Sequence, residues 1–165
     1  MHHRKSLKYD PLKMSLNEKL LNMQGNCLME KQFKILIVDD SHALRSMLKN
    51  TLMHAGFVTF ADFFEAEHGL NALNLLKRDT FHMVISDWDM PKMDGLELLK
   101  TMHADENLAK IPFIMVSSIS DQDKVVEAIK AGVDHYITKP FKPDSLAHHV
   151  KDLLIARNGS AKPLP

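Results

Sequence analysis

The 165-residue chain has one cysteine, no net charge and no long apolar run, and each of these absences excludes a class of protein. Cys27 cannot form an intramolecular disulfide and has no neighbouring cysteine or suitably spaced histidine with which to hold zinc. The 21 basic and 21 acidic residues balance, so the total charge indicates no nucleic-acid or membrane surface. Apolar runs such as residues 35–38 and 113–116 are far shorter than the roughly 20 residues that span a bilayer. Since the N-terminus also lacks an apolar signal core, we expect a cytoplasmic protein.

From Lys34 onward, short β-rich runs that end in polar residues alternate with stretches of helical periodicity. This alternation is typical of βαβ units and predicts an α/β domain with a doubly wound, five-stranded parallel sheet and five helices. The expected strands are residues 34–38, 57–61, 82–86, 112–116 and 136–138. The expected helices are one that ends at Gly56, residues 69–78 and 96–104, one capped by Ser120, and one that begins at Pro143.

Four of these helices carry an apolar stripe that we assign to the core. The stripes are Leu44, Leu48, Leu52 and Ala55, then Leu70, Leu73 and Leu76, then Val125, Ile129 and Val133, and finally Leu146, Val150 and Leu153. The region around the second strand also contains Phe60, Phe63 and Phe64. We interpret these aromatics as core filling, with a partner surface as the alternative.

Residues 1–33 lie outside the repeating pattern and are expected to be an extension that is flexible or forms one short helix. A capping-box pattern and a short apolar stripe occur there, formed by Ser15 and Glu18 and by Leu16, Leu20 and Met23. Because so short a helix is marginal in water, a mostly disordered leader is favoured. The alternatives are a docking or membrane-surface helix and translation that starts at Met29. The repeating pattern then forms one domain, residues 34–157, followed by a loose tail, residues 158–165.

Five polar residues follow the expected strands at their carboxyl ends. Asp39 and Asp40 follow the first strand, Asp87 the third, Ser117 the fourth and Lys139 the fifth. Taken singly, an aspartate here is as easily a helix cap and the serine a loop hydroxyl. Together they indicate a site, because ligands bind open parallel sheets at the carboxyl ends of the strands.

Three carboxylates in one crevice repel each other, at about 4 kcal/mol for two unit charges roughly 4 Å apart. A protonated acid, the ammonium of Lys139 or a hard divalent cation relieves this repulsion, and an all-oxygen site that also takes phosphate suits Mg²⁺. In the absence of a cation we expect a raised pKa for at least one aspartate. A carboxylate beside Mg²⁺ is also a nucleophile toward a phosphoryl group, whose oxygens Ser117 and Lys139 can contact.

These residues belong to four segments that resemble response-regulator receiver domains. The segments are Ile37-Val-Asp39-Asp40, Ser86-Asp87-Trp-Asp-Met-Pro-Lys-Met-Asp-Gly95, Met115-Val-Ser117 and Tyr136-Ile-Thr-Lys139-Pro140-Phe141. The match covers roughly residues 34–157. Within the family the sequence is most similar to the single-domain chemotaxis branch (CheY-like), and Arg45 in the first expected helix is one of the residues that carry this similarity. The resemblance implies the flavodoxin-like strand order 2-1-3-4-5.

Carried over by position, the resemblance implies that Asp87 is the phosphoacceptor. It implies that Asp40, Asp87 and the backbone carbonyl of Asp89 are metal ligands for Mg²⁺, with Asp39 holding a metal-bound water. Two positions depart from the chemotaxis branch, since Asp89 replaces an amide and Ile119 replaces an acid. Both flank the path of the attacking water, so we expect a dephosphorylation rate that differs from that branch in a direction the sequence leaves open.

The resemblance also implies a switch at the other side of the site. Ser117 and Lys139 would contact the phosphoryl oxygens, and the bond before Pro140 is expected to be cis. Tyr136 would swing inward as the Ser117 hydroxyl moves toward the phosphate, remodelling the face of the fourth helix, fifth strand and fifth helix. The alternative for Tyr136 is an ordinary half-buried strand tyrosine.

The implied function is a stand-alone response regulator of a two-component phosphorelay, which is a signalling switch and not an enzyme. A sensor histidine kinase would be the donor and a downstream protein the target, with the flagellar motor switch, a phosphorelay intermediate and a non-motility adaptor as candidates. Too few residues flank the domain for a DNA-binding domain. We therefore expect a monomer that signals by protein contact, without DNA or a membrane span.

Two other functions compete with this one. Asp87-Trp-Asp89 after an apolar strand imitates the nucleophile loop of haloacid-dehalogenase-type phosphatases. That family places the motif on its first strand, with a threonine or valine where Pro91 stands here. The other alternative is an interaction module that binds Mg²⁺ but does not use phosphate. A nucleotide-binding fold is disfavoured because no glycine-rich loop follows any strand.

Overall fold

The aliphatic runs form the parallel sheet that the alternating pattern predicts. The computed structural model describes residues 33–57 and 61–156, together with the backbone alone of residues 157 and 158. The strands there are β1 (Phe33–Val38), β2 (Ala61–Ala66), β3 (Met83–Ser86), β4 (Phe113–Ser117) and β5 (His135–Thr138), all parallel, in the order β2-β1-β3-β4-β5. The strand order 2-1-3-4-5 is therefore confirmed.

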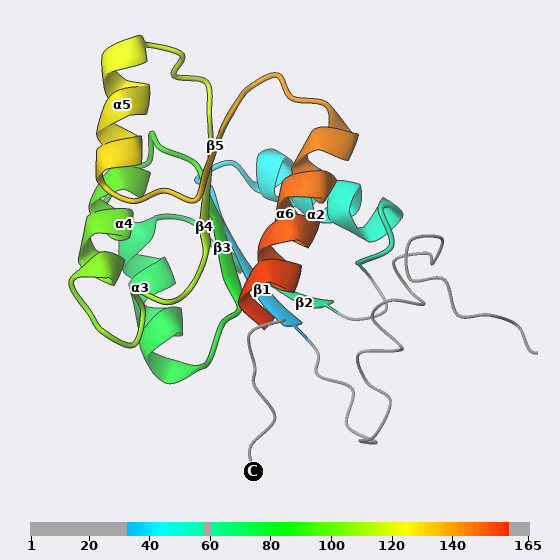
Figure 1. Cartoon of the computed structure of the whole chain (residues 1–165), viewed down its shortest axis with the longest axis horizontal. Coiled ribbons are helices and arrows are strands. Elements are labelled where there is room, and N and C mark those ends of the chain that lie inside the picture. The colour runs from blue at the N-terminus through cyan, green and yellow to red at the C-terminus, as the bar shows by residue number, and fades with distance from the viewer. Residues whose placement is uncertain (1–32, 58–60, 159–165) are drawn as a thin grey trace, which may run out of the picture. The chain divides into compact units, whose positions relative to one another are not determined.

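Helices cover both faces of this sheet. The described ranges contain α2 (His42–His54), α3 (Gly69–Arg78), α4 (Gly95–His103), α5 (Gln122–Lys130) and α6 (Pro143–Asn158). Figure 1 shows α2 and α6 on one face and α3, α4 and α5 on the other. Short polar side chains cap three of the helices at their N-termini, namely Ser41 for α2, Asp94 for α4 and Asp121 for α5. Gly56, with φ of 95°, follows the end of α2 in the left-handed conformation that favours glycine.

Each face of the sheet packs against its own hydrophobic core. Leu36 and Val38 of β1 lie in the core beneath α3 and α4, whereas Ile35 and Ile37 lie in the core beneath α2 and α6. Alternate residues of a strand point to opposite faces, so a strand covered on both sides has to be apolar throughout. This explains why residues 35–38 of β1 form a continuous apolar run, with the polar residues of the site directly after it.

The predicted position of the second strand was wrong, because β2 runs over Ala61–Ala66 instead of 57–61. Phe57 is buried in the core beneath α2, and this packing, rather than a place in the sheet, accounts for its apolar character. β2 is an edge strand that pairs with β1, and its Phe63 and Phe64 pack against the two cores. The interpretation of these two aromatics as core filling is confirmed.

Four predicted helix positions were also wrong. Leu70 of α3 and Ile129 of α5 are 44% and 60% exposed, and Ala55 is exposed just beyond the end of α2. The buried stripe of α3 follows i, i+3, i+4 and i+7 spacing and consists of Gly69, Ala72, Leu73 and Leu76. In α5 the buried residue is Ala128, and the cap is Asp121 instead of Ser120.

The last helix shows the same spacing rule. Leu146 and Val150 are fully buried as predicted, but the stripe continues at Leu154, which is four residues further on, while Leu153 is partly buried. No helix within the described residues is long and apolar enough to cross a membrane. The expectations for the leader, Cys27, Met29, Phe60 and the tail concern residues 1–32, 58–60 and 159–165, which lie outside the described residues.

Candidate functional site

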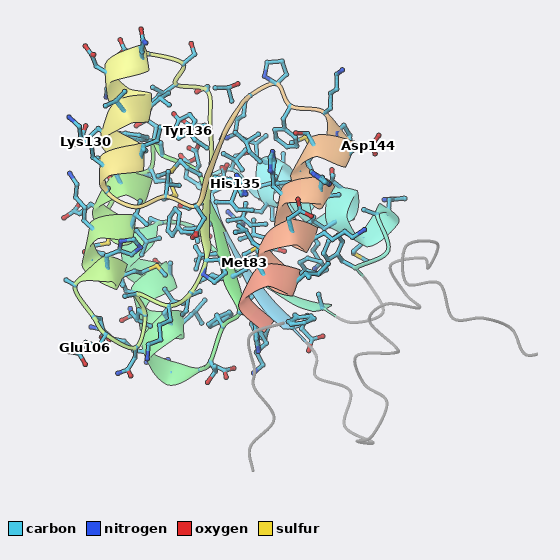
Figure 2. All side chains as sticks on the ribbon, viewed as in Figure 1. Met83, Glu106, Lys130, His135, Tyr136 and Asp144 are labelled. Atoms are coloured by element: carbon cyan, nitrogen blue, oxygen red, sulfur yellow. The ribbon has the colours of Figure 1, made fainter. Side chains whose placement is uncertain are left out.

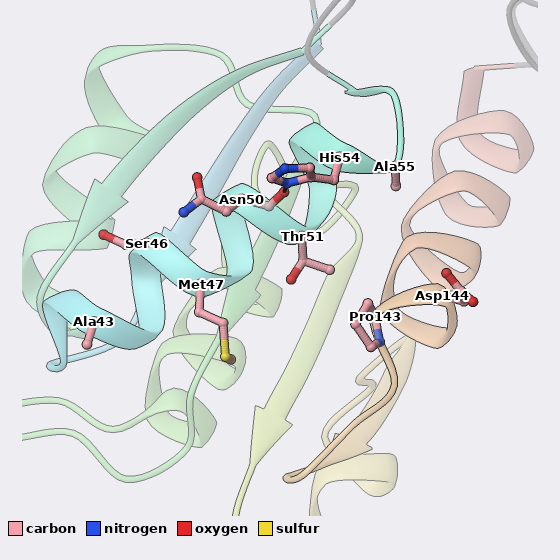
Figure 3. A pocket seen from close by; sticks show the side chains of 9 residues that line it. All are labelled: Ala43, Ser46, Met47, Asn50, Thr51, His54, Ala55, Pro143 and Asp144. Atoms are coloured by element: carbon pink, nitrogen blue, oxygen red, sulfur yellow. Dashed lines mark hydrogen bonds between the residues drawn. The ribbon is translucent and has the colours of Figure 1, made fainter.

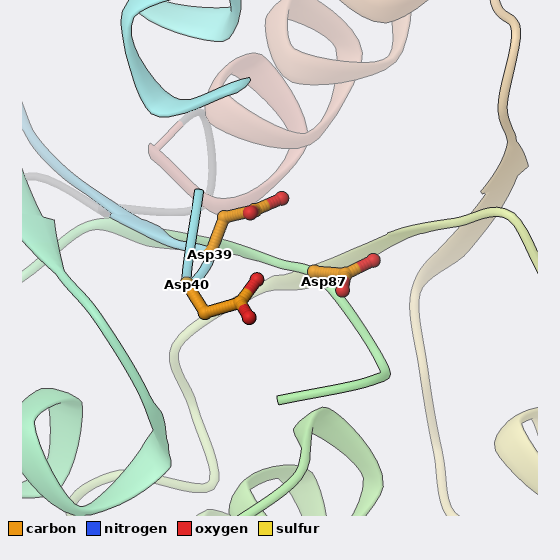
Figure 4. Close-up of side chains that lie close together, drawn as sticks. All are labelled: Asp39, Asp40 and Asp87. Atoms are coloured by element: carbon orange, nitrogen blue, oxygen red, sulfur yellow. The ribbon is translucent and has the colours of Figure 1, made fainter. Parts of the chain in front are cut away.

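The five polar residues that follow the strands lie together at one edge of the sheet. Asp39 follows β1, Asp87 follows β3, Ser117 ends β4 and Lys139 follows β5. Asp39, Asp40 and Asp87 each offer a carboxylate oxygen, and these oxygens lie within 4.8 Å of one another (Figure 4). Asp39 and Asp87 are buried and Asp40 is exposed, so the cluster opens to water on one side.

Lys139 is the cation of this cluster. Its Nζ donates to Oδ2 of Asp39 at 3.2 Å and to Oδ1 of Asp87 at 3.0 Å. Its backbone N–H donates to the carbonyl of Ser117 at 2.8 Å, and the Lys139–Pro140 peptide bond is cis. A long side chain from the edge strand thus reaches the carboxylates that follow the two central strands.

The carboxyl of Asp87 is harder to ionise than an ordinary aspartate. Burial is the main cause that raises its pKa above 3.8, and the charge of Asp39 raises it further. The hydrogen bond and charge of Lys139 act in the opposite direction without reversing the shift. The direction agrees with the expectation of a raised pKa for at least one aspartate, although burial contributes more to it than the neighbouring carboxylate does.

The cluster fits a hard divalent cation. Three carboxylates converge on it, one of them is exposed to water, and oxygen ligands of this kind suit Mg²⁺. Mg²⁺ in proteins usually keeps several waters and is bound by one or two carboxylates together with phosphate oxygens. The side chain of Asp89 is exposed and is not part of the group of three carboxylates within the described residues.

Asp39 is fixed by contacts on both its side chain and its backbone. Its Oδ1 accepts from the N–H of Ser41 at 2.8 Å, while its carbonyl accepts from Nη1 of Arg45 at 2.7 Å. Arg45 is itself buried, and its Nε donates to Oε2 of Glu65 on β2 at 3.0 Å. Sequence reasoning missed this role, although a basic residue at the spacing of the buried stripe of α2, three residues before Leu48, is its signal.

The backbone of Asp87 is held by three neighbours. Its N–H donates to the carbonyl of Val38 at 2.8 Å, and its carbonyl accepts from the Ser86 hydroxyl at 2.8 Å. The third neighbour is Gly95 at the start of α4, where an added Cβ would overlap the carbonyl oxygen of Asp87. In the sequence Gly95 appeared only as the last residue of the segment that starts at Ser86, yet its lack of a side chain lets α4 begin directly against the site.

Ser117 and Tyr136 are linked through the backbone of Ile119. The Ser117 hydroxyl accepts from the Ile119 N–H at 3.1 Å, and the Tyr136 hydroxyl donates to the Ile119 carbonyl at 2.7 Å. Burial raises the pKa of Tyr136, opposed by the Ser117 hydroxyl and assisted by the charge of Asp87. The Trp88 ring lies edge-on to Tyr136, with centroids 6.2 Å apart. This path joins the serine of the site to a side chain on the edge strand.

The loop after Asp87 contacts the loop before α3. Lys92, with φ of 67°, places its Nζ 3.1 Å from Nε2 of His68, and His68 caps α3 by accepting from the Asn71 N–H at 3.2 Å.

A separate cavity of about 620 Å³ lies between α2 and the start of α6, where Met47, Thr51 and Pro143 are among its lining residues (Figure 3). None of the five polar site residues lines that cavity.

Comparison with known proteins agrees with this geometry. The profile of the response regulator receiver domain family matches residues 35–151. The chemotaxis protein CheY homolog of Campylobacter jejuni subsp. jejuni is 42% identical over 127 residues, which cover 76% of this chain and 95% of that protein.

Solved structures give the same result. A response regulator receiver domain protein (CheY-like) from Methanospirillum hungatei has a TM-score of 0.70 at 28% identity and covers 79% of this chain and 99% of its own. The Vibrio cholerae chemotaxis protein CheY4 has a TM-score of 0.66 at 30% identity, covering 74% of this chain and 98% of its own.

Proposed function

The chain belongs to the response regulator receiver domain family, and from this premise we propose that Asp87 accepts a phosphoryl group from a histidine kinase. Members of this family are signalling switches, and they typically use Mg²⁺ at an acidic pocket. One observation carries the proposal. The buried carboxylate of Asp87 lies 3.0 Å from the Lys139 ammonium and shares a cluster with Asp39 and Asp40.

The proposed metal ligands are Asp40, Asp87 and the backbone carbonyl of Asp89. When bound, Mg²⁺ neutralises the crowded carboxylates and stabilises charge on the transferred group. Both oxygens of Asp39 already accept hydrogen bonds, from Ser41 and Lys139, and this favours a role through a metal-bound water.

In the proposed transfer, a carboxylate oxygen of Asp87 attacks the phosphorus of the donor phosphohistidine. A new P–O bond forms, the P–N bond breaks, and the histidine nitrogen leaves with the bonding pair and takes up a proton. Lys139 turns from the Asp87 carboxylate to the phosphoryl oxygens, and the Ser117 hydroxyl becomes a second donor to them. Both groups contact charge that grows on the oxygens during transfer.

The proposed switch follows from the contacts of Ile119. Ser117 has to release the Ile119 N–H in order to turn its hydroxyl toward the phosphoryl group. The same peptide segment holds the Tyr136 hydroxyl, so the movement alters the position of Tyr136. The face formed by α5, β5 and α6 then differs between the two states, and we propose that the target protein binds there.

The partners we propose are a sensor histidine kinase and a downstream target. Since relatives at 42% identity are chemotaxis proteins, the flagellar motor switch is a candidate target, alongside a phosphorelay intermediate or a non-motility adaptor. The phosphatase alternative is not supported, because the Asp-Trp-Asp loop follows β3 in the middle of the sheet and the family is that of receivers.

Asp89 and Ile119 are proposed to tune the lifetime of the aspartyl phosphate. Asp89 is exposed in the loop after the acceptor, and Ile119 is partly buried two residues beyond Ser117. Exchange to the chemotaxis-branch residue types, Asp89→Asn with Ile119→Glu, is expected to change the decay rate on Phos-tag gels. An unchanged rate contradicts this tuning role while leaving the acceptor assignment intact.

Acetyl phosphate and Mg²⁺ test the proposed function directly. We expect one phosphoryl group per chain, no uptake in Asp87→Asn, and retained uptake in the matched control Asp89→Asn. Circular dichroism shows whether Asp87→Asn keeps the fold. Steady turnover of p-nitrophenyl phosphate would indicate a phosphatase, and no uptake by the folded wild-type protein would indicate a phosphate-independent module.

A further inference from the structure

A second cluster of potential ligands lies on β5 and α6, outside the acidic site. His135, labelled in Figure 2, is the first residue of β5. His148 and His149 belong to α6. The ring centroids of His135 and His149 lie 4.3 Å apart, with the ring planes tilted by 38°. The ring of His148 lies 6.0 Å from that of His149. The proposed phosphoryl chemistry uses none of these side chains.

The separation of His135 and His149 is close to that of two imidazoles on one metal ion. With metal–nitrogen bonds of about 2.0–2.1 Å, centroids at neighbouring coordination positions lie roughly 4.5–5.2 Å apart. The observed centroid distance of 4.3 Å is slightly shorter than this range. To bind one ion, the two rings would have to move slightly apart and rotate so that one nitrogen of each points toward the ion. Both side chains are half-buried at the surface, where the broad χ2 well of histidine permits this rotation.

Further donors lie on the same helix. Nε2 of His148 lies 3.1 Å from Oδ2 of Asp152, one turn along α6. Two ligand atoms of one ion with bonds of this length are about 3.0–3.4 Å apart, so this pair also has a chelating separation. Both side chains are more than half exposed and are free to reorient toward the half-buried pair.

The potential ligand atoms of the histidine cluster lie further apart than those of the acidic cluster. Among residues 33–57 and 61–158, Asp39, Asp40 and Asp87 form the one group of three potential ligands with donor atoms within 4.8 Å of one another. A metal at the histidines therefore binds first to the pair that is already in contact, and then recruits a third ligand from the exposed side chains.

The chemistry of the donors selects a class of metal. Imidazole nitrogen suits zinc, nickel and copper, whereas magnesium and calcium prefer the oxygens of the acidic site. Burial and the two neighbouring imidazoles lower the pKa of His149, against the charge of Asp152. His149 is therefore neutral at neutral pH, which is the form that binds metal.

We propose that His135 and His149 form the core of a site for a divalent transition metal such as Zn²⁺, with His148 or Asp152 as a further ligand. The bound ion would tie the edge strand β5 to α6 next to Tyr136. It is distinct in position and in ligand chemistry from the Mg²⁺ site.

Calorimetric titration of the full-length chain with ZnCl₂ in saturating Mg²⁺ tests this site. A background protein with His2→Ala, His3→Ala and Cys27→Ser removes other potential zinc ligands from the N-terminal part of the sequence. We expect one zinc ion per chain in this background.

The histidine variants then locate the ion. His135→Gln and His149→Gln are each expected to weaken zinc binding by at least about tenfold, whereas His54→Gln, a histidine on the exposed side of α2, is expected to leave it unchanged. The proposal is overturned if the background protein binds no zinc, or if both core variants bind it with unchanged affinity. Weakening in His148→Gln with none in His149→Gln places the ion on α6 alone and also contradicts it.

Thermal unfolding supplies a second readout that does not depend on the titration. Because a ligand that binds only the folded state stabilises it, zinc should raise the Tm of the background protein. The increase should be absent in His149→Gln, with circular dichroism confirming that this variant is folded. An equal increase in both proteins contradicts the assignment.

Discussion

The two sides of the proposed phosphoryl site are held by different kinds of contact. On the side of β1, the backbone of Asp39 is fixed by the buried guanidinium of Arg45, which also pairs with Glu65. On the side of β4, Ser117 and Tyr136 are each held by a neutral hydrogen bond to one peptide segment. Charge-assisted contacts of a buried cation are roughly twice as strong as neutral ones.

This difference matches the two tasks of a switch. In the proposed mechanism the side that binds the metal keeps its contacts during phosphoryl transfer, whereas the side of Ser117 changes its contacts. Neutral hydrogen bonds, each with a net value of about 0.5–1.5 kcal/mol, are weak enough to be exchanged for contacts to a phosphoryl group. The comparison predicts that substitutions on the β1 side weaken Mg²⁺ binding. Substitutions on the β4 side should retain phosphoryl uptake but alter the structural response to it.

The largest effect is expected at Gly95, which lies against Asp87, the proposed acceptor. Gly95→Ala places a Cβ on the carbonyl oxygen of Asp87, so Asp87 or α4 has to move. We expect loss of phosphoryl uptake and a fall of about 1–3 kcal/mol in the free energy of unfolding, measured by urea denaturation. Gly56→Ala is the control, since it meets no atom within 4 Å and strains only its positive φ. Equal uptake in both variants would show that the close approach at Gly95 is unimportant.

Removal of the Arg45 guanidinium tests the fixed side. Arg45→Met leaves the Asp39 carbonyl and the Glu65 carboxylate without their buried donor, at an expected cost of about 1–3 kcal/mol in stability. Mg²⁺ affinity, followed by Trp88 fluorescence, should weaken with it. Lys49→Met removes the other cation near Glu65, at 3.7 Å and partly exposed, and should cost under about 1 kcal/mol. Unchanged Mg²⁺ affinity in Arg45→Met would contradict the idea that Arg45 fixes the proposed metal-binding side.

Tyr136→Phe tests the exchangeable side. It removes the hydrogen bond to the Ile119 carbonyl and should cost about 0.5–1.5 kcal/mol, with phosphoryl uptake retained. The change in Trp88 fluorescence on addition of beryllofluoride should differ from the wild type, because the two rings are in contact. If uptake is lost in this variant, Tyr136 belongs to the binding side and the comparison is wrong.

The smallest effect is expected from pH. Because the folded protein raises the pKa of Asp87 above its unfolded value near 3.8, the native state binds this proton more tightly than the unfolded chain. Its contribution to stability is therefore present at low pH and is lost as pH rises through the folded pKa. Urea unfolding without Mg²⁺ should show this decline, and Asp87→Asn should flatten it. A variant as pH-dependent as the wild type assigns the decline to other groups.

Sequence reasoning predicted the convergence of the polar residues because it depends on one topological rule, that parallel strands end at the same edge. It placed β2 wrongly because Phe57 is apolar for a tertiary reason, burial beneath α2, that local pattern does not distinguish from a strand. Leu70 and Ile129 were misassigned because each lies one residue, or about 100° around the helix, from a buried position of its helix, Gly69 and Ala128 respectively. Their three- or four-residue spacing from other apolar residues does not show which side of the helix is buried.

The parts of the site that the sequence did not reveal act through packing or the backbone. Gly95 matters for a side chain it lacks, and Ile119 links Ser117 to Tyr136 by its peptide groups, which every residue type carries. Arg45 reaches a carbonyl, an acceptor that no sequence motif marks. Contacts of these kinds can be identified only in the folded structure.

Chemical mapping of the phosphoryl group tests the central claim most directly. Borohydride reduces an acyl phosphate at an aspartate to homoserine, so peptide mass spectrometry after treatment with acetyl phosphate and Mg²⁺ locates the acceptor. The contacts of the site predict homoserine at position 87 and at neither Asp39 nor Asp40. Homoserine at either of those two aspartates, or at none of the three in a folded protein, would contradict the account.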